Sequence, residues 1–257
     1  MLDKPLAGMK TSGRNPRIQR HTRPSPDSRP SKKVARYRDA IARHIEEHWG
    51  EPSRLFHDTI SEYVRVHIHV VEATKERPYH TLITSGMSDR PMRTPKEVKE
   101  YRFAELVISL PPTWPLDGKG WKHERHWWPF QWLRQIARLP HEFNTFLFYG
   151  HTVPNGDPAK PFAPGTKLCC MLLSSPVLCG EEADTLAIDK KTQIHFYSPI
   201  PIYREEMDFA LSRGSVELLE RLENAGVTEL WDLQRTNVCK GGRTKAARLT
   251  SRPKHAK

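Results

Sequence analysis

The chain has 257 residues, with 41 Lys and Arg against 30 Asp and Glu, a formal charge of +11 at pH 7 and 37% hydrophobic residues. No stretch approaches the roughly 18 consecutive apolar residues that a membrane-spanning helix needs, so the sequence argues against a membrane protein. The length is ample for a domain with its own hydrophobic core.

The positive charge is concentrated at the two ends of the chain. Residues 1–38 carry 11 basic and 2 acidic side chains, and residues 240–257 carry 7 basic and no acidic ones. The span 39–239 therefore holds 23 basic and 28 acidic side chains, a net charge of −5. A nucleic-acid-binding domain places its basic residues on the folded surface, whereas basic tails are more often solvated, disordered arms. We therefore predict a disordered basic leader at 1–33 and a disordered basic tail at 240–257, with only weak nucleic-acid contact. A regulator that holds DNA or RNA by these tails is the alternative.

The first element expected after the leader is an amphipathic helix over residues 33–49. Its apolar residues recur at three- and four-residue steps, as one face of a helix requires. Ser31 is a candidate cap for its start, and Gly50 followed by Pro52 predicts its end. The apolar positions are Val34, Tyr37, Ile41, Ile45 and Trp49.

About six strands are expected, the clearest of them from strict alternation of apolar and polar residues. In the run 64–70, every second residue from Val64 to Val70 is Val or Ile, which predicts a half-buried strand. The other runs are 79–84, 103–110, 144–149, 168–173 and 194–203.

Short helices are expected between and after these strands. Thr94-Pro95-Lys96-Glu97 has the pattern of a capping box with proline at the first helical position. Another helix is predicted from near Pro129 to Leu139, where Pro140 ends it. Residues 204–212 and 215–225 are predicted to form a helical hairpin.

The order of these elements favours an α+β fold, because strands are interrupted by single helices of mixed length without regular βα alternation. We predict a single domain over residues 34–239. Its core is a mixed or antiparallel sheet of about six strands, covered by a helix layer on one face.

No catalytic motif is visible. The chain lacks the G-x-S-x-G nucleophile turn and the G-x-G-x-x-G and G-x-x-x-x-G-K phosphate loops. Its four cysteines, Cys169, Cys170, Cys179 and Cys239, form no C-x-x-C pair, and residues 1–20 contain no apolar signal segment. The sequence therefore predicts a cytoplasmic, non-catalytic protein that needs no cofactor.

Histidines are the candidate metal ligands. His67 and His69 lie two apart on the expected strand 64–70 and so share one face, with His80 on the next strand as a third candidate. His123 and His126 form a second pair. Thirteen histidines make such pairs common by chance, and the polar outer face of a strand is the commoner role. We therefore predict no metal site; a zinc hydrolase is the alternative, and stoichiometric metal on purification would support it.

Two further features have a structural and a functional interpretation. Glu105 lies in the apolar run 103–110, where a carboxylate needs a partner. A bond to a neighbouring Arg or to backbone amides is the commoner arrangement, and a general base is the alternative. Trp128 and Trp132, four apart, are expected to pin their helix to the sheet. The alternative is that the tryptophans stack on bases or sugars; the cluster comprises Trp114, Trp121, Trp127, Trp128 and Trp132.

Three runs of sequence together resemble one protein family. They are HTLITSGMSDRPM at 80–92, AELVISLPPTW at 104–114, and the helix from Trp128 to Pro140. The pattern resembles the bacterial branch of the Suppressor of fused domain family, in which a T-S-G-M-S-x-x-P-M loop precedes an A-E-L-x-I-x-L-P-x-x-W strand. The resemblance covers about residues 35–203. The matching residues, which we expect to be structural, are Thr84, Ser85, Gly86, Met87, Ser88, Pro91, Met92, Glu105, Leu110, Pro111 and Trp114.

The resemblance implies a protein-binding module and not an enzyme. Bacterial members are associated with immunity proteins that neutralise polymorphic toxins, and the animal protein of that name holds a transcription factor by pairing with an extended peptide. An immunity protein that binds a toxin domain is therefore the predicted function. The acidic span 39–239 suits a basic partner such as a nuclease.

The candidate partner-binding segment is the long loop 150–167 and its flank. It mixes charge with an aromatic side chain and is stiffened by four prolines, which reduces the ordering entropy lost on binding. A loop that merely covers the sheet is an equally good interpretation. The candidate contact residues are Tyr149, His151, Asn155, Asp157, Lys160 and Phe162.

Overall fold

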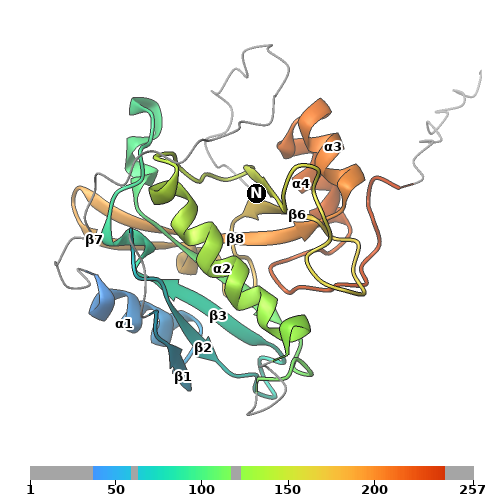
Figure 1. Ribbon diagram of the computed structural model, residues 1–257. Helices are drawn as coiled ribbons and strands as arrows, with labels where there is room; N and C mark the ends of the chain where they lie inside the picture. Colours follow the sequence, from blue (N-terminus) through green and yellow to red (C-terminus); the bar gives the residue numbers. More distant parts are fainter. Residues whose placement is uncertain (1–36, 59–62, 117–122, 241–257) are drawn as a thin grey trace, which may run out of the picture.

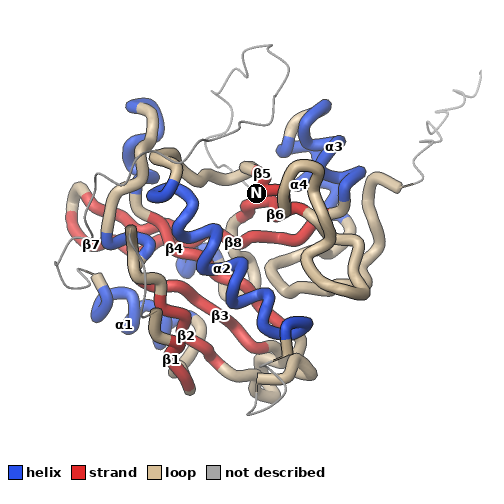
Figure 2. Tube along the Cα trace, in the orientation of Figure 1, coloured by secondary structure: helices blue, strands red, loops and turns tan. Residues whose placement is uncertain are grey.

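The computed structural model describes residues 37–58, 63–116 and 123–240, and its centre is a mixed eight-stranded sheet (Figures 1 and 2). The order is β1-β2-β3-β4-β8-β6-β5, and β7 pairs with β8. Every pair is antiparallel except β4 and β8, which run parallel. The expected α+β fold with a mixed sheet is confirmed. The strands are β1 (Arg54–Phe56), β2 (His67–Val71), β3 (His80–Ser85), β4 (Ala104–Leu110), β5 (Thr152–Pro154), β6 (Cys170–Ser174), β7 (Thr185–Asp189) and β8 (Thr192–Ile202).

Helices cover both faces of the sheet, and not only one face as expected. On β8, Ile194 and Phe196 pack with α1, and Ile200 and Ile202 pack with α3 and α4, whereas Tyr197 belongs to the core cluster that contains α2. Alternate strand residues point to opposite faces, so α1, α3 and α4 share one face and α2 covers the other. The helices are α1 (Arg38–His48), α2 (Glu124–Glu142), α3 (Arg204–Arg213) and α4 (Ser215–Asn224), with short 3-10 turns η1 (Met87–Asp89), η2 (Lys96–Arg102) and η3 (Glu181–Asp184).

Helix α2 is longer than its prolines predict. It contains both Pro129 and Pro140, although an interior proline removes a backbone hydrogen bond and costs about 3 kcal/mol. Packing outweighs this cost, because α2 buries a stripe of large side chains against the sheet: Trp128, Phe130, Trp132, Leu133, Ile136 and Ala137.

The chain after α4 fills a gap between β4 and β8. The Ser109 amide donates to the Glu229 carbonyl and the Trp231 amide to the Ser109 carbonyl, each at 2.9 Å. The carbonyl of Pro199 on β8 accepts from Trp231 Nε1 at 2.9 Å, and that of Pro201 accepts from an Arg235 guanidinium nitrogen at 3.0 Å. The C-terminal segment therefore satisfies strand carbonyls that β4 no longer reaches.

The expected strand at 144–149 is wrong, because this segment caps α2. Asn144 has a φ of +52°, and the Thr145 amide donates to the Pro140 carbonyl at 2.9 Å. A left-handed residue followed by this six-to-one bond is a Schellman motif, which reverses the chain. The adjacent strand is instead β5.

One expected helix start is changed by the structure, and another lies outside the described residues. The segment after Thr94 is a 3-10 turn, η2, and it has no side-chain cap. The proposed Ser31 cap, the leader 1–33 and the tail from residue 241 lie outside the described residues. Among the described residues, no helix combines the length and the apolar character that crossing a bilayer needs.

Candidate partner-binding site

The T-S-G-M-S segment wraps around one buried carboxylate, which holds the β3–η1 connection against β4. Glu105 has no exposed surface. One of its oxygens accepts from Gly86 N at 2.9 Å, Ser88 N at 3.0 Å and Ser88 Oγ at 2.6 Å, and the other accepts from Thr84 Oγ1 at 2.7 Å. Burial raises the pKa of Glu105, and the hydrogen bonds from Ser88 and Thr84 oppose that rise. Backbone amides and hydroxyl groups therefore satisfy the hydrogen-bonding capacity of this buried carboxylate.

Gly86 is required by this arrangement. Its φ is +107°, and a Cβ at this position would lie 2.0 Å from the Arg65 carbonyl oxygen. The other motif residues support the same structural role. Met87, Met92 and Leu110 are buried in the core, the Ser85 hydroxyl bonds His69 Nε2 at 2.9 Å, and Trp114 Nε1 donates to the His126 carbonyl at 3.2 Å. Pro111 is half-buried, and Pro91 is the exposed member.

The candidate zinc ligands are engaged separately. His67 Nδ1 accepts from the Asp58 amide at 3.3 Å and its Nε2 lies 3.0 Å from an Arg38 nitrogen. His80 Nδ1 accepts from the Ala73 amide at 3.1 Å, and its Nε2 lies 3.2 Å from the Pro112 carbonyl. The expectation that His67 and His69 form a solvated polar face is wrong, because both are buried, with Arg38 from α1 over His67. The described part of the chain contains no group of three metal-ligating side chains.

Strand β5 lies at an edge of the sheet and has backbone groups that point away from its neighbour β6. The Leu173 amide donates to the His151 carbonyl, and the Asn155 amide donates to the Cys169 carbonyl, each at 2.9 Å. Backbone groups alternate between the two edges of a strand, so Thr152 and Pro154 direct theirs away from β6. Pro154 has no N–H, and its carbonyl already accepts from the Gly156 amide at 3.0 Å. Among the described residues, the open ladder groups of this edge are therefore the N–H and the C=O of Thr152. Sequence analysis did not identify Thr152 as a candidate, because a three-residue strand is too short to show the alternation of apolar and polar residues.

The loop after β5 is held in its conformation by hydrogen bonds between its own residues. Asn155 Nδ2 donates to the carbonyls of Lys160 at 2.9 Å and Pro161 at 3.0 Å, and the Lys160 amide donates to the Asn155 carbonyl at 2.8 Å. Asp157 and Lys160 are exposed, and Tyr149 and His151 are half-buried beside β5. The structure therefore places the predicted contact residues on one connected segment, with Asn155 shaping the loop.

Phe162 is the exception, because its ring belongs to the core. It is 8% exposed, its centroid lies 5.5 Å from that of Trp128 with the planes 4° apart, and 4.8 Å from that of Trp132. Trp128 also stacks on Trp231 at 5.0 Å. Phe162 therefore anchors the loop to α2, and we exclude its ring from the proposed contact surface.

Replacing Phe162 by alanine is expected to cost about 3–4 kcal/mol in free energy of unfolding, because a buried aromatic ring and two ring contacts are lost. Urea denaturation measures the loss, and amide exchange at Lys160 should accelerate as the loop loosens. The control is Lys160→Ala in the same loop, expected to change stability by less than about 0.5 kcal/mol. A Phe162→Ala loss under about 1 kcal/mol would contradict the anchor role.

Comparison with known proteins gives one family. The sequence model of the family described as Suppressor of fused protein matches residues 62–236. A search of curated proteins found no match to the chain. A protein of Neisseria gonorrhoeae FA 1090, described as a Suppressor of fused homologue, has a similar structure with a TM-score of 0.57 and 17% identity, covering 79% of this chain and 96% of that one. The Sufu–Fu complex gives a TM-score of 0.56 and 16% identity over 80% of this chain and 93% of the other. Drosophila Suppressor of Fused gives 0.52 and 16% over 78% of this chain and 50% of the other.

Proposed function

The chain belongs to the Suppressor of fused family, and from that premise we propose that its function is to bind another protein through the edge of β5 and the adjoining loop. The open edge is the observation that carries this proposal. β5 is the last strand in the sheet order, and the outward N–H and C=O of Thr152 can pair with an extended segment of a partner.

The loop supports recognition because it is already ordered by the Asn155 hydrogen bonds and the Phe162 anchor. A preformed loop loses little conformational entropy on binding. Asp157 and Lys160 are exposed on it and can contribute charge contacts beside the added strand. The Sufu–Fu complex is a protein complex of that relative, which is in keeping with a binding role for the fold.

We further propose that the partner is a toxin domain and that this chain is a cytoplasmic immunity protein that blocks it without catalysis or a cofactor. The net charge of −5 over residues 39–239 suits a basic toxin such as a nuclease. Electrostatic attraction then accelerates encounter, so the association rate should fall as salt is raised.

Thr152→Pro is expected to weaken binding of a toxin domain encoded in the adjacent reading frame by at least about tenfold, because the variant removes the donor of the β5 edge and places a ring against an added strand. Calorimetry with the full chain measures the dissociation constant. The matched control is Ala187→Pro on β7. The His195 amide donates to the Phe103 carbonyl at 3.0 Å, so His195 and Gln193 direct their backbone groups away from β7. Ala187 lies opposite Gln193 and therefore directs its own toward the outer edge of β7, and Ala187→Pro should bind like the unmodified chain.

Thermal melts must show both variants folded. Equal binding by Thr152→Pro and the unmodified chain would contradict the β5 site. A toxin domain that does not bind, or whose toxicity persists on co-expression, would contradict the immunity role.

A further inference from the structure

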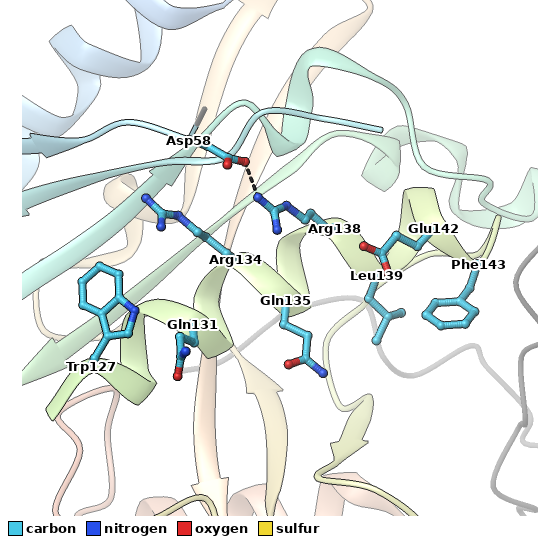
Figure 3. Close-up of a pocket in the computed structure, with 9 residues that line it drawn as sticks. All are labelled: Asp58, Trp127, Gln131, Arg134, Gln135, Arg138, Leu139, Glu142 and Phe143. Carbon is cyan, nitrogen blue, oxygen red and sulfur yellow. Dashed lines mark hydrogen bonds and ion pairs between the residues drawn. The ribbon is translucent and has the colours of Figure 1, made fainter. Parts of the chain in front are cut away.

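A groove of about 600 Å³ runs along the outward side of α2, but the charges that line it balance (Figure 3). The guanidinium groups of Arg134 and Arg138 lie there with the carboxylates of Asp58 and Glu142. Asp58 forms an ion pair with Arg138, and Glu142 is engaged in an interaction of its own. The two positive and two negative charges cancel, in contrast to the flank of α3 beside β5.

Helix α3 runs along the part of the sheet that ends in β5. Ile202, Cys170 and Pro154 lie in one row across β8, β6 and β5, and α3 begins just after this row. Its other end lies near the start of β5, because a Cβ on Gly150 would lie 2.6 Å from the Oγ of Ser215, the first residue of α4. The middle of α3 is therefore level with the middle of β5.

The side of α3 that carries Phe209 faces away from β5. The Phe209 ring centroid lies 4.1 Å from the guanidinium carbon of Arg221 on α4. Glu206, on the same side of the helix, forms a buried ion pair with Arg235 of the C-terminal segment, and Met207 is buried against the sheet. Since α4 and the C-terminal segment occupy this flank, the opposite flank of α3 faces the β5 edge.

The flank that faces β5 carries Arg204, Asp208 and Leu211, which are spaced by four and three residues as one helical stripe requires. A guanidinium nitrogen of Arg204 donates to the carbonyl of Ala159, in the loop after β5, at 2.5 Å. Leu211 is half-buried and packs against the core cluster of α3 and α4. Asp208 is exposed between them, in the middle of α3 and so level with Thr152.

Asp208 carries a charge that no nearby cation neutralises. Within residues 37–58, 63–116 and 123–240, its carboxylate forms no ion pair or hydrogen bond. Its charge reaches the strands: burial raises the pKa of the Cys169 thiol just before β6, Arg204 opposes that rise, and Asp208 adds to it. Because Glu205 is also exposed, the first two turns of α3 present two carboxylates and one guanidinium group to solvent.

A strand added to β5 directs one side chain toward this flank. Thr152 lies opposite Leu172 in the ladder, and Leu172 belongs to the core cluster of α3 and α4, so the Thr152 side chain is on the α3 face. A partner residue directly opposite Thr152 points to the same face, with its Cβ about 5 Å away. The long, flexible stem of a lysine or arginine at that position can bring its charge to the Asp208 carboxylate.

We propose that Asp208 selects a basic residue of the partner strand, at the position opposite Thr152. The inference rests on the proposed strand addition at β5 and specifies the residue that the site recognises. The backbone of Thr152 provides the attachment, and Asp208 determines which side chain is preferred beside it. A basic residue also suits the net charge of −5 over residues 39–239.

The test uses the full ¹⁵N-labelled chain and follows the backbone amides of Thr152 and Asp208 by NMR. The probe is the peptide acetyl-Thr-Val-Lys-Val-Thr-amide, and the controls carry Gln or Glu in place of Lys. We expect saturable shifts at both amides, with the Lys peptide bound about three- to fivefold more tightly than the Gln peptide and the Glu peptide bound most weakly. Asp208→Asn should bind the Lys and Gln peptides equally. The matched control is Glu220→Gln, which removes an exposed carboxylate from α4 and should keep the preference for Lys.

Equal affinity of the unmodified chain for the Lys and Gln peptides would overturn the inference and leave strand addition at β5 standing. A preference for Lys that survives in Asp208→Asn would do the same. Shifts at Asp208 without any at Thr152 would also overturn it, because the peptide would then bind as a surface ion pair away from the edge. If no peptide shifts the Thr152 amide, or if Thr152→Pro binds the peptides as the unmodified chain does, the β5 proposal itself fails and this inference fails with it.

Discussion

Replacement of Glu105 by alanine is expected to destabilise the protein by about 3–5 kcal/mol, a large part of the 5–15 kcal/mol that holds a typical domain folded. The variant leaves four donors without an acceptor in the core, two from the backbone of Gly86 and Ser88 and two from the hydroxyls of Thr84 and Ser88. Thr84 Oγ1 also accepts from the Leu106 amide at 2.8 Å, so the disturbance reaches the β3–β4 pairing.

Glu105→Gln refines the prediction, because it keeps the shape and removes one acceptor. Turned toward Gly86 and Ser88, the NH₂ faces two backbone donors; turned toward Thr84, it can donate to Oγ1 but leaves that hydroxyl without its acceptor. We therefore expect a loss between that of Glu105→Ala and none. Urea denaturation monitored by tryptophan fluorescence measures both variants. The control is Glu100→Ala, an exposed residue of η2, expected within about 0.5 kcal/mol of the unmodified chain. A Glu105→Ala loss under about 1 kcal/mol would refute the role of this carboxylate in holding the loop.

The predictable parts of this fold are those whose signal is local. Strands β2, β4 and β8 follow from residues that alternate or run apolar over five residues or more, and the amide partners of Glu105 follow from the cost of burying a carboxylate. The run 144–149 was wrongly predicted to be a strand, because its apolar side chains pack against the core although the segment is a loop. Asn144 there completes a helix cap, and the apolar pattern does not reveal that turn.

The features that define the candidate sites are non-local, which is why the sequence did not reveal them. Arg204 of α3 and Ala159 of the loop after β5 are 45 positions apart, and Phe162 meets Trp128 only after the loop folds back over α2. The sequence marked Phe162 as an aromatic in a polar loop, which describes a contact residue and a core anchor equally well. Only the packing distinguishes the two roles.

Acidification is expected to remove several kcal/mol of stability between about pH 6.5 and pH 4. Burial lowers the pKa of His67, of His69 and of His141 to about 4 in each case. The charge of Arg38 adds to the lowering at His67, and His67 itself adds to it at His69. In this pH range the unfolded chain binds protons at these rings and the folded chain does not, so stability rises with pH and is lost as the pH falls.

Each ring contributes at most about 3 kcal/mol to this loss, since one pKa unit corresponds to about 1.4 kcal/mol. The sum is smaller, because His67 and His69 interact and titrate together. Urea midpoints at pH 7, 6, 5 and 4.5 measure the slope. His69→Gln should flatten the slope, as its amide can still reach the Ser85 hydroxyl but does not titrate. His123→Gln, an exposed residue before α2, is the matched control and should leave the slope unchanged. A stability that is constant from pH 7 to 4.5 would show that these histidines are not buried as neutral rings beneath Arg38 and beside η1.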